Sequence, residues 1–267
     1  MDAVTLIFLC CLALGAVVGV MAGLLGIGGG LIIVPVLAYL LADVLNVPAT
    51  ETIVVAIATS LSTIIFTGMS SARAHYRLGN LRPEIILWCG FGIGIGAVLG
   101  ARLASAMPGQ WLKAIFAVLV ILIAAYMIFG KRVESENSFD RSKLAIIGSG
   151  TGIISALMGI GGGALLVPAL TWYRVNVRHA IGCAAFSGII IAIFGSLSFV
   201  ISGWHYGQLE QGFLGYVYLP ATLGIVATSV FTAPIGAKLG QSMNTQRLKK
   251  VFAAFLVLVS IRMLWGM

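Results

Sequence analysis

The chain of 267 residues is 60% hydrophobic and only 9% charged, whereas soluble domains carry about 25% charged residues. So few charges cannot cover a water-soluble surface, and apolar stretches of about 20 residues, long enough to cross a bilayer, recur along the whole length. The formal net charge of +8 would suggest nucleic acid as the partner of a soluble protein. Here most basic residues lie in short connections between apolar segments, so we expect no nucleic acid partner and interpret them as an orientation signal.

The predicted fold is all-α, a polytopic integral membrane protein. Polar residues, proline and glycine divide the chain into helical segments. In the first half these segments cover residues 4–25, 30–43, 51–72, 84–106 and 110–130, and in the second half 144–158, 163–173, 178–203, 212–240 and 247–266. Residues 4–22 have the length of a signal peptide, but no basic residue precedes them and no cleavage site is evident, so we expect the segment to be retained.

An internal repeat organises the sequence. Residues 23–37 read GLLGIGGGLIIVPVL and residues 156–170 read ALMGIGGGALLVPAL. Further along, GARL at 100–103 corresponds to GAKL at 236–239. A match at fixed spacing in both halves indicates duplication. We therefore predict a first membrane repeat at residues 1–130, a polar cytoplasmic linker at 131–143 and a second membrane repeat at 144–267.

The two repeats are predicted to have inverted topology. The segments that flank each GIGGG motif form either two steep spans or a re-entrant hairpin, and both alternatives contribute an even number of crossings. Each half then crosses the membrane an odd number of times. Cytoplasmic connections carry the Lys/Arg excess, and the inverted topology places all four basic connections on that side, with both termini facing the periplasm across an inner membrane. The basic residues are Arg73, Arg77 and Arg82; Lys131, Arg132, Arg141 and Lys143; Arg174 and Arg178; and Lys238, Arg247, Lys249 and Lys250.

Each GIGGG motif predicts a broken helix. Unsatisfied backbone groups in hydrocarbon cost several kcal/mol each, so a break survives only where protein or a water-lined cavity covers it. The helix that begins after the break presents free N–H groups and its positive dipole end, which bind anions. Paired breaks in inverted halves are typical of a transporter's substrate site. The candidate substrate-binding residues in the motifs are Gly26, Gly28, Gly29, Gly30, Gly159, Gly161, Gly162 and Gly163.

The alternative is that these glycines only allow helices to pack closely, as small residues do throughout membrane bundles. We assign that packing role to Gly92, Gly96 and Gly100, which have GxxxG-like spacing. For the GIGGG motifs we favour the substrate site, because four glycines in five residues exceed what packing requires.

The paired G-x-G-G-G motifs, each followed by an apolar run and then Pro35 or Pro168, resemble the TauE/SafE family of membrane transport proteins, known as sulfite exporters. The resemblance includes the length and the duplicated arrangement and covers essentially the whole chain. It implies transport of sulfite, sulfoacetate or another sulfur-containing or organic anion. A small anionic substrate and the lipid bilayer are therefore the expected partners.

Other polar residues in the apolar segments are weaker candidates. Thr59 and Ser60 follow a stretch of small residues suited to close approach, although membrane hydroxyl groups often bond only to the backbone one turn back. Arg73 is a candidate substrate attractor, since its position in the second half carries no basic residue, whereas Arg102 is matched by Lys238 and fits a helix-end role. Cys183 is interpreted as a small packing residue.

His75-Tyr76 and His205-Tyr206 occupy similar places in the two halves and are candidate inner and outer gates. Interfacial tyrosines also serve as ordinary membrane anchors. Imidazole titrates near neutral pH, which allows proton or ion coupling. No acidic residue lies deep in a predicted span, so a carboxylate proton relay is not indicated.

The sequence predicts a transporter that works by alternating access. An anion channel is the alternative, because glycine breaks also build filters. A membrane enzyme is a weaker alternative, but HExxH, paired membrane carboxylates and plausible Ser/His/Asp arrangements are absent, so we expect no catalytic residues and no enzyme activity. A Walker A motif is absent too. We expect no metal site and no cofactor, because the four cysteines show no ligand spacing. A homo-oligomer is compatible with these features.

Overall fold

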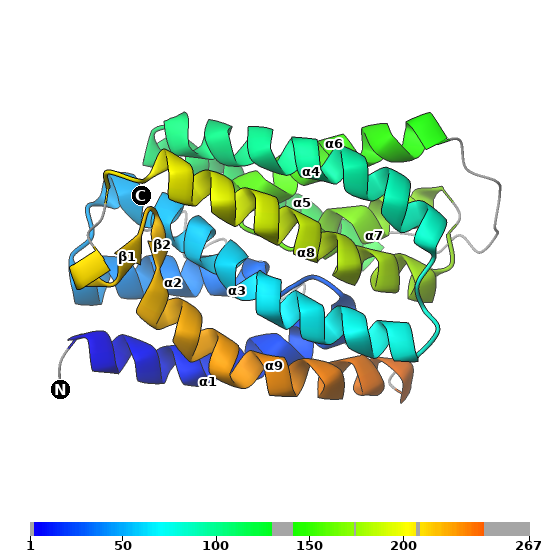
Figure 1. Cartoon of the computed structure of the whole chain (residues 1–267), viewed down its shortest axis with the longest axis horizontal. Helices are drawn as coiled ribbons and strands as arrows, with labels where there is room; N and C mark the ends of the chain where they lie inside the picture. Colours follow the sequence, from blue (N-terminus) through cyan, green and yellow to red (C-terminus); the bar gives the residue numbers. More distant parts are fainter. Residues whose placement is uncertain (1–2, 130–140, 174, 207–208, 243–267) are drawn as a thin grey trace.

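A computed structural model describes residues 3–129, 141–173, 175–206 and 209–242, which form a bundle of helices with one short hairpin (Figure 1). The helices of the first half are α1 (Ala3–Leu25), α2 (Gly30–Leu45), α3 (Ala49–Arg77), α4 (Pro83–Ala106) and α5 (Gly109–Phe129). Those of the second half are α6 (Arg141–Met158), α7 (Gly163–Trp172), α8 (Val177–Ser202), the 3₁₀ turn η1 (Leu209–Gln211) and α9 (Leu219–Ser242), and β1 (Phe213–Leu214) pairs antiparallel with β2 (Val217–Tyr218).

Among the described residues, α1, α3, α4, α8 and α9 are the helices long and apolar enough to cross a membrane. The helices that follow the glycine motifs are shorter: α2 has 16 residues and α7 has 10. At 1.5 Å per residue α7 covers about 15 Å, or half of the hydrocarbon layer. The predicted all-α polytopic membrane fold, with a broken-helix hairpin at each GIGGG motif, is confirmed.

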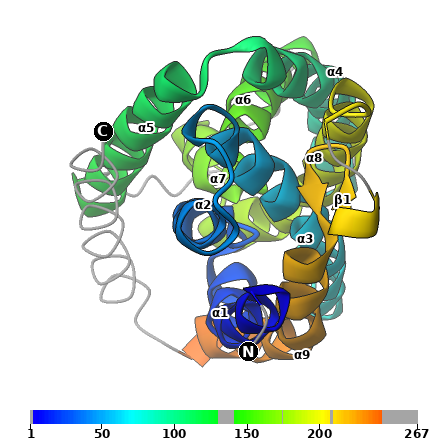
Figure 2. The ribbon, with the colours of Figure 1, turned by 90° about the vertical axis from the view of Figure 1, so that its left-hand side faces the viewer.

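The two halves exchange helices. In α1, Gly15, Gly19 and Gly23 lie against successive turns of α9, so these two helices run parallel. Glycines 92, 96 and 100 of α4 lie in the same way against α6. The first helix of each half therefore packs against the fourth helix of the other half, and Figure 2 shows these two pairs on opposite sides of the bundle. The glycines allow backbones to approach closely, which is the packing role predicted for Gly92, Gly96 and Gly100.

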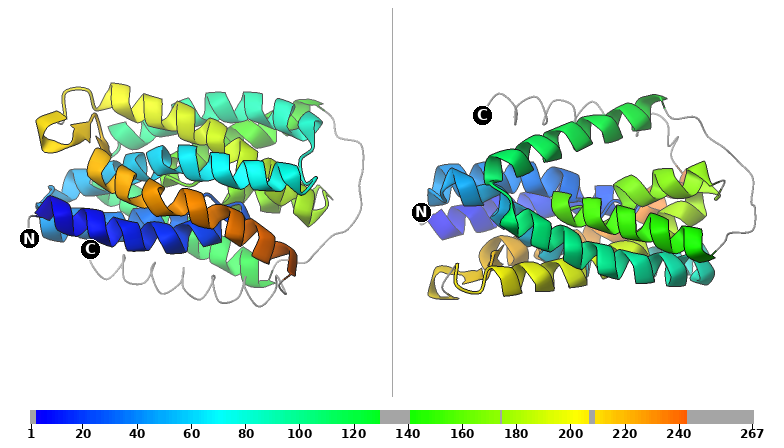
Figure 3. Two further views of the ribbon diagram at one scale, coloured as in Figure 1. Left: turned by 60° about the horizontal axis from the view of Figure 1, so that its bottom comes forward. Right: turned by 90° about the horizontal axis from the view of Figure 1, so that it is seen from above.

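Most of the described basic residues lie towards one end of the bundle. The basic end is where α3 and α9 end and where α4, α6 and α8 begin, and the N-terminal end is where α1 begins (Figure 3). Towards the basic end lie Arg73, Arg77, Arg82, Arg141, Lys143, Arg178 and Lys238, with Glu84. Towards the N-terminal end lie Asp43, Glu51, Arg102 and Lys113. This asymmetry is the arrangement expected when the basic end faces the cytoplasm.

One predicted boundary is wrong. The segment predicted at 212–240 begins as a helix only at Leu219, and the preceding residues form the β1–β2 hairpin. Gly212 and Gly215 both have positive φ, which suits turns, and Gly215 packs directly on the backbone of Val200. Because both glycines adopt turn conformations, the helix cannot extend through this stretch, although the stretch is apolar. The helix α6 begins at Arg141, inside the predicted linker, and the segment predicted at 247–266 lies outside the described residues.

Replacement of Gly96 by alanine is expected to destabilise the protein, because the added methyl group would meet the carbonyl oxygen of Ser149 on α6. Overpacking of this kind costs about 1–3 kcal/mol. Thermal unfolding in detergent measures the effect. Gly150→Ala is the matched control, since its methyl group would meet none of the described residues within 4 Å. Equal melting temperatures for the two variants would contradict the packing interpretation.

Impermeant maleimide labelling in intact cells tests the orientation. Gln110 and Ser142 are exposed near the N-terminal and basic ends respectively. In a Cys10→Ala background, in which the other cysteines are buried, we expect Gln110→Cys to be labelled from outside and Ser142→Cys to be labelled only after permeabilisation. The reverse pattern would place the basic end outside.

Candidate functional site

The two GIGGG stretches meet in the middle of the bundle and run antiparallel to each other. A methyl group on Gly28 would lie 3.0 Å from the Cα of Gly161, and one on Gly161 would lie 3.1 Å from the Cα of Gly28. On either side of this contact, Gly30 abuts the carbonyl of Gly159, and Gly163 abuts the carbonyl of Gly26. The pairs are thus arranged around an approximate two-fold axis between Gly28 and Gly161. We call this contact the glycine crossing.

Backbone conformation also requires glycine at the crossing. Gly29 has φ of 84° and Gly162 has φ of 75°, and each is the residue immediately before a helix. These values lie in the left-handed region that other residues adopt only with strain. The glycines therefore serve two purposes, since they turn the chain sharply and they let two backbones touch.

The helices that begin at the crossing are the ones predicted from the motifs. The first backbone hydrogen bonds of α2 run from Ile32 and Ile33 to the carbonyl of Gly29, at 3.0 and 3.2 Å. Within the part of the chain that the structure describes, the N–H groups of Gly29, Gly30 and Leu31 have no acceptor. The start of α2 therefore offers unpaired donors at the positive end of a helix dipole.

The start of α7 is less open. The N–H groups of Gly162 and Gly163 donate to the carbonyls of Ile160 and Gly161, at 2.8 and 2.9 Å. The N–H groups of Leu165 and Leu166 donate to Gly162. Although the two motifs have the same five letters, their donors are not equally available.

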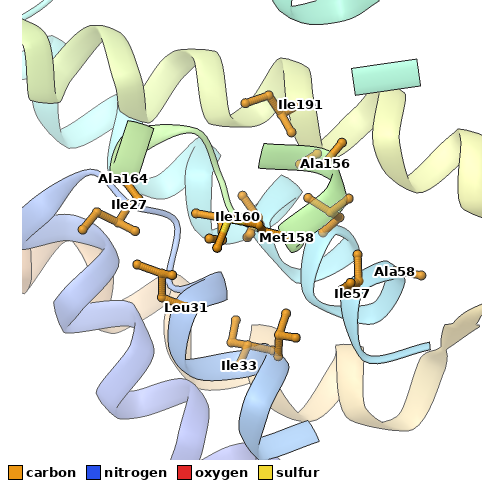
Figure 4. Close-up of a cluster of buried hydrophobic side chains, with 14 of the residues drawn as sticks. Ile27, Leu31, Ile33, Ile57, Ala58, Ala156, Met158, Ile160, Ala164 and Ile191 are labelled. Atoms are coloured by element: carbon orange, nitrogen blue, oxygen red, sulfur yellow. The ribbon is translucent and has the colours of Figure 1, made fainter. Parts of the chain in front are cut away.

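Aliphatic side chains surround the crossing (Figure 4). Buried residues from both motifs and from α2, α3, α6, α7 and α8 gather here: Ile27, Leu31, Ile33, Ile57, Ala58, Ala156, Met158, Ile160, Ala164 and Ile191. Such side chains exclude water from the backbone. The described conformation is therefore closed at its centre.

Ser60 lies beside the crossing and Thr59 beside the β1–β2 hairpin, and both have protein partners, so their role in substrate binding stays a prediction. The hydroxyl of Ser60 donates to the carbonyl of Gly159 at 2.8 Å, and that of Thr59 accepts the N–H of Tyr218 at 3.0 Å. The first bond ties α3 of one half to the glycine motif of the other. The second ties α3 to the β1–β2 hairpin, so both hydroxyls hold the site's framework together.

Further hydroxyls join α3 to α9. Ser62 pairs with Thr222 at 2.7 Å, and Thr67 pairs with Ser229 at 2.6 Å. All four side chains are buried. Hydrogen bonds between membrane helices contribute about 0.6–2 kcal/mol each, so this row fixes α9 against α3.

Two buried hydroxyls near the second motif have no partner among the described residues, namely those of Ser155 and Ser187. The carbonyl of Ser155 accepts the N–H of Ile160 just before the motif, and Ser187 adjoins Gly188, which packs on the carbonyl of Gly161. A buried hydroxyl without a partner carries a desolvation cost, so each such group calls for an explanation. The sequence gives no signal that separates these serines from their bonded neighbours.

Arg73 lies away from the crossing. It is exposed on α3, on the same stripe as Phe66, Met69 and Tyr76, whose side chains are 49%, 55% and 70% exposed. In a membrane protein such an apolar stripe faces lipid. Its role as a substrate attractor stays a prediction, and its position on the lipid-facing stripe does not favour that role. Arg102 is exposed towards the opposite end of the bundle, as a helix-end residue would be.

The two His-Tyr pairs lie at opposite ends of the bundle but in different surroundings. His75 is buried, and its Nε2 lies 3.0 Å from the carbonyl of Gly23 while Asn80 approaches its Nδ1 at 3.4 Å. Tyr76 is exposed, and so is His205. Tyr206 instead packs against Phe213 and Tyr216 of the hairpin region, with ring centroids 6.0 and 4.9 Å apart.

Tyr206 also contacts the start of α3. Burial, together with a hydrogen bond to Glu51 and the charge of that carboxylate, raises the pKa of the Tyr206 hydroxyl above its usual value. The phenol therefore stays protonated at physiological pH and can donate to Glu51. A gating role for either pair stays a prediction.

Cys183 makes the contacts of a packing residue. It is buried, and its Sγ lies 3.4 Å from the backbone nitrogen of Arg82, which connects α8 to the start of α4. Within the described residues, no group of three or more His, Cys, Asp or Glu side chains is placed to hold a metal ion.

Comparison with known proteins identifies the class and then the family. The chain is similar over nearly its full length to proteins named as probable membrane transporters: one from Haemophilus influenzae is 40% identical over 96% of this chain and 97% of its own. One from Methanocaldococcus jannaschii is 24% identical over 94% and 92%, and YunE of Bacillus subtilis is 26% identical over 97% of both chains. No solved structure matches. A multi-pass bundle with two broken helices meeting at its centre, together with these relatives, defines a membrane transporter.

The family model of the sulfite exporter TauE/SafE matches residues 11–263. The chain therefore belongs to the TauE/SafE family, as the paired glycine motifs predict. Both motifs lie within the matched residues, as do α2 and α7, the helices that begin at the glycine crossing.

Proposed function

We propose that this transporter moves a small anion, such as sulfite, sulfoacetate or another sulfur-containing or organic anion, across the bacterial inner membrane by alternating access at the glycine crossing. The observation that carries the proposal is the unpaired N–H donors at the start of α2, which lie in the middle of the bundle. Buried amides of this kind favour an anion. The family name supports the same class of substrate.

The geometry of the crossing supports alternating access. From the crossing, α2 runs towards the N-terminal end, where α3 begins, and α7 runs towards the basic end, where α8 begins. A small rotation of one hairpin against the other about the two-fold axis would open the site to one side and close it to the other. Transporters with inverted repeats commonly work in this way.

Ser187 is our candidate for an additional substrate contact. Among the described residues its buried hydroxyl beside the second motif has no partner, so a bound oxyanion would supply an acceptor. In the first half, by contrast, the hydroxyl of Ser60 beside the crossing already donates to the carbonyl of Gly159. This asymmetry would allow substrate to bind in one orientation.

A channel is the second candidate, and counterflow separates the two. In vesicles reconstituted with the full-length protein, we expect saturable uptake of labelled sulfite, thiosulfate, sulfoacetate or a small carboxylate, accelerated by the same unlabelled anion inside. A pH gradient that changes the rate would indicate proton coupling. Uptake that rises linearly with concentration and shows no counterflow would indicate a pore, and transport of none of these anions would reject the proposed substrate class.

A pair of serine variants tests the site. Ser187→Ala is expected to raise the KM for the transported anion about tenfold, the equivalent of one hydrogen bond to a charged group, without loss of thermal stability. Ser60→Ala is expected to lower thermal stability instead, because it leaves the carbonyl of Gly159 without its donor. An unchanged KM for well-folded Ser187→Ala would remove that residue from the site.

A further inference from the structure

An apolar groove of about 550 Å³ opens on the outside of the bundle at its basic end. Its walls come from α3, the loop that follows it, α4 and α8, and the lining residues are Tyr76, Gly79, Leu81, Pro83, Ile86, Leu87 and Phe186. It reaches from the loop between α3 and α4 to the tenth residue of α8. The groove is separate from the glycine crossing, because its lining contains no residue of either motif.

The walls of the groove are suited to a hydrocarbon chain. The side chains of Tyr76 and Leu87 are 70% and 67% exposed, and that of Phe186 is 37% exposed. These exposed apolar groups lie on spanning helices, where the surrounding solvent is lipid. A concave apolar surface contacts more of an acyl chain than the flat face of a helix does.

Basic residues adjoin the lining residues in the chain, and we call them the basic rim of the groove. Arg73 and Arg77 are exposed on α3, three residues before and one residue after Tyr76. Arg82 is exposed between the lining residues Leu81 and Pro83, and Glu84 is the nearby acidic residue in the sequence. Arg73 lies about one turn further from the helix end than Arg77, on the stripe that faces lipid. A cation at that depth is stabilised by an anionic group at the level of the headgroups.

The corresponding place in the second half is built differently. The position that corresponds to Arg73 is Gly203, one residue after α8 ends at Ser202, and Tyr206, the counterpart of Tyr76, follows the helix instead of lying within it. The connection to α9 then carries the β1–β2 hairpin instead of the five residues 78–82 that join α3 to α4. The groove with its basic rim is therefore a feature of one half, so the two-fold arrangement of the transport site does not account for it.

We propose that the groove binds an anionic phospholipid, with an acyl chain along Tyr76, Leu87 and Phe186 and the headgroup phosphate between Arg73 and Arg77. Charge complementarity selects an anionic lipid over a zwitterionic one, and the apolar lining selects a lipid over a soluble phosphate. The site lies where α3, α4 and α8 meet, and α3 and α8 also carry the residues beside the glycine crossing. Occupancy would therefore hold these helices together at the basic end.

Native mass spectrometry of the full-length protein in detergent, titrated with phosphatidylglycerol or phosphatidylcholine, measures the binding. We expect phosphatidylglycerol to bind at least about tenfold more tightly, and the double variant Arg73→Gln/Arg77→Gln to lose that preference, since each basic residue near an anionic headgroup strengthens binding several-fold. Arg102→Gln is the charge control, because Arg102 is exposed towards the opposite end and should leave the preference unchanged.

A second pair of variants tests the apolar part of the site. Leu87→Trp is expected to fill the groove and weaken phosphatidylglycerol binding, whereas Leu99→Trp, an exposed position on the same helix, should bind as the parent protein does. Thermal unfolding without added lipid checks that the variants fold. Equal binding of the two lipids, retention of the preference in the double arginine variant, or equal binding of glycerol phosphate without acyl chains would each overturn the proposal.

Discussion

The structure depends on one constraint, which is that backbone polar groups within a membrane must not face hydrocarbon. A chain that breaks two helices in the middle of a bilayer exposes such groups twice. Here the two broken stretches cover each other, because Gly28 lies against Gly161 and the carbonyls of Gly26 and Gly159 lie against glycines of the opposite motif. The exchange of α1 and α6 between the halves follows from this arrangement, since each hairpin must reach the crossing from its own end of the bundle.

The two halves differ at the places where directional transport would require them to differ. At the start of α2, the N–H groups of Gly29, Gly30 and Leu31 have no acceptor among the described residues, whereas at the start of α7 the N–H groups of Gly162 and Gly163 are bonded. The β1–β2 hairpin covers one end of the bundle, and the arginine-rimmed groove lies towards the other. The duplicated halves thus form a two-fold framework, and local differences between them distinguish one end of the bundle from the other.

The helices and the repeat could be predicted because each follows from a local pattern: apolar runs of spanning length, a nine-residue match around GIGGG, and basic connections. The two breaks were predictable for the same reason. The antiparallel contact of the motifs was not, because it joins residues far apart in the sequence and no local pattern shows that they meet. Likewise the sequence does not distinguish Ser60, which bonds to Gly159, from Ser187, which has no partner among the described residues, and it does not show that Arg73 lies on the stripe facing lipid.

Hydrogen–deuterium exchange of the reconstituted protein, with and without a transported anion, tests the central claim most directly. If the anion binds at the glycine crossing, exchange in the peptide that contains Gly29, Gly30 and Leu31 will slow when the anion is added, because the free N–H groups there acquire an acceptor. Peptides from the α1–α9 and α4–α6 contacts will change little. Protection by a saturating anion elsewhere in the bundle, with unchanged exchange at residues 29–31, would contradict the account.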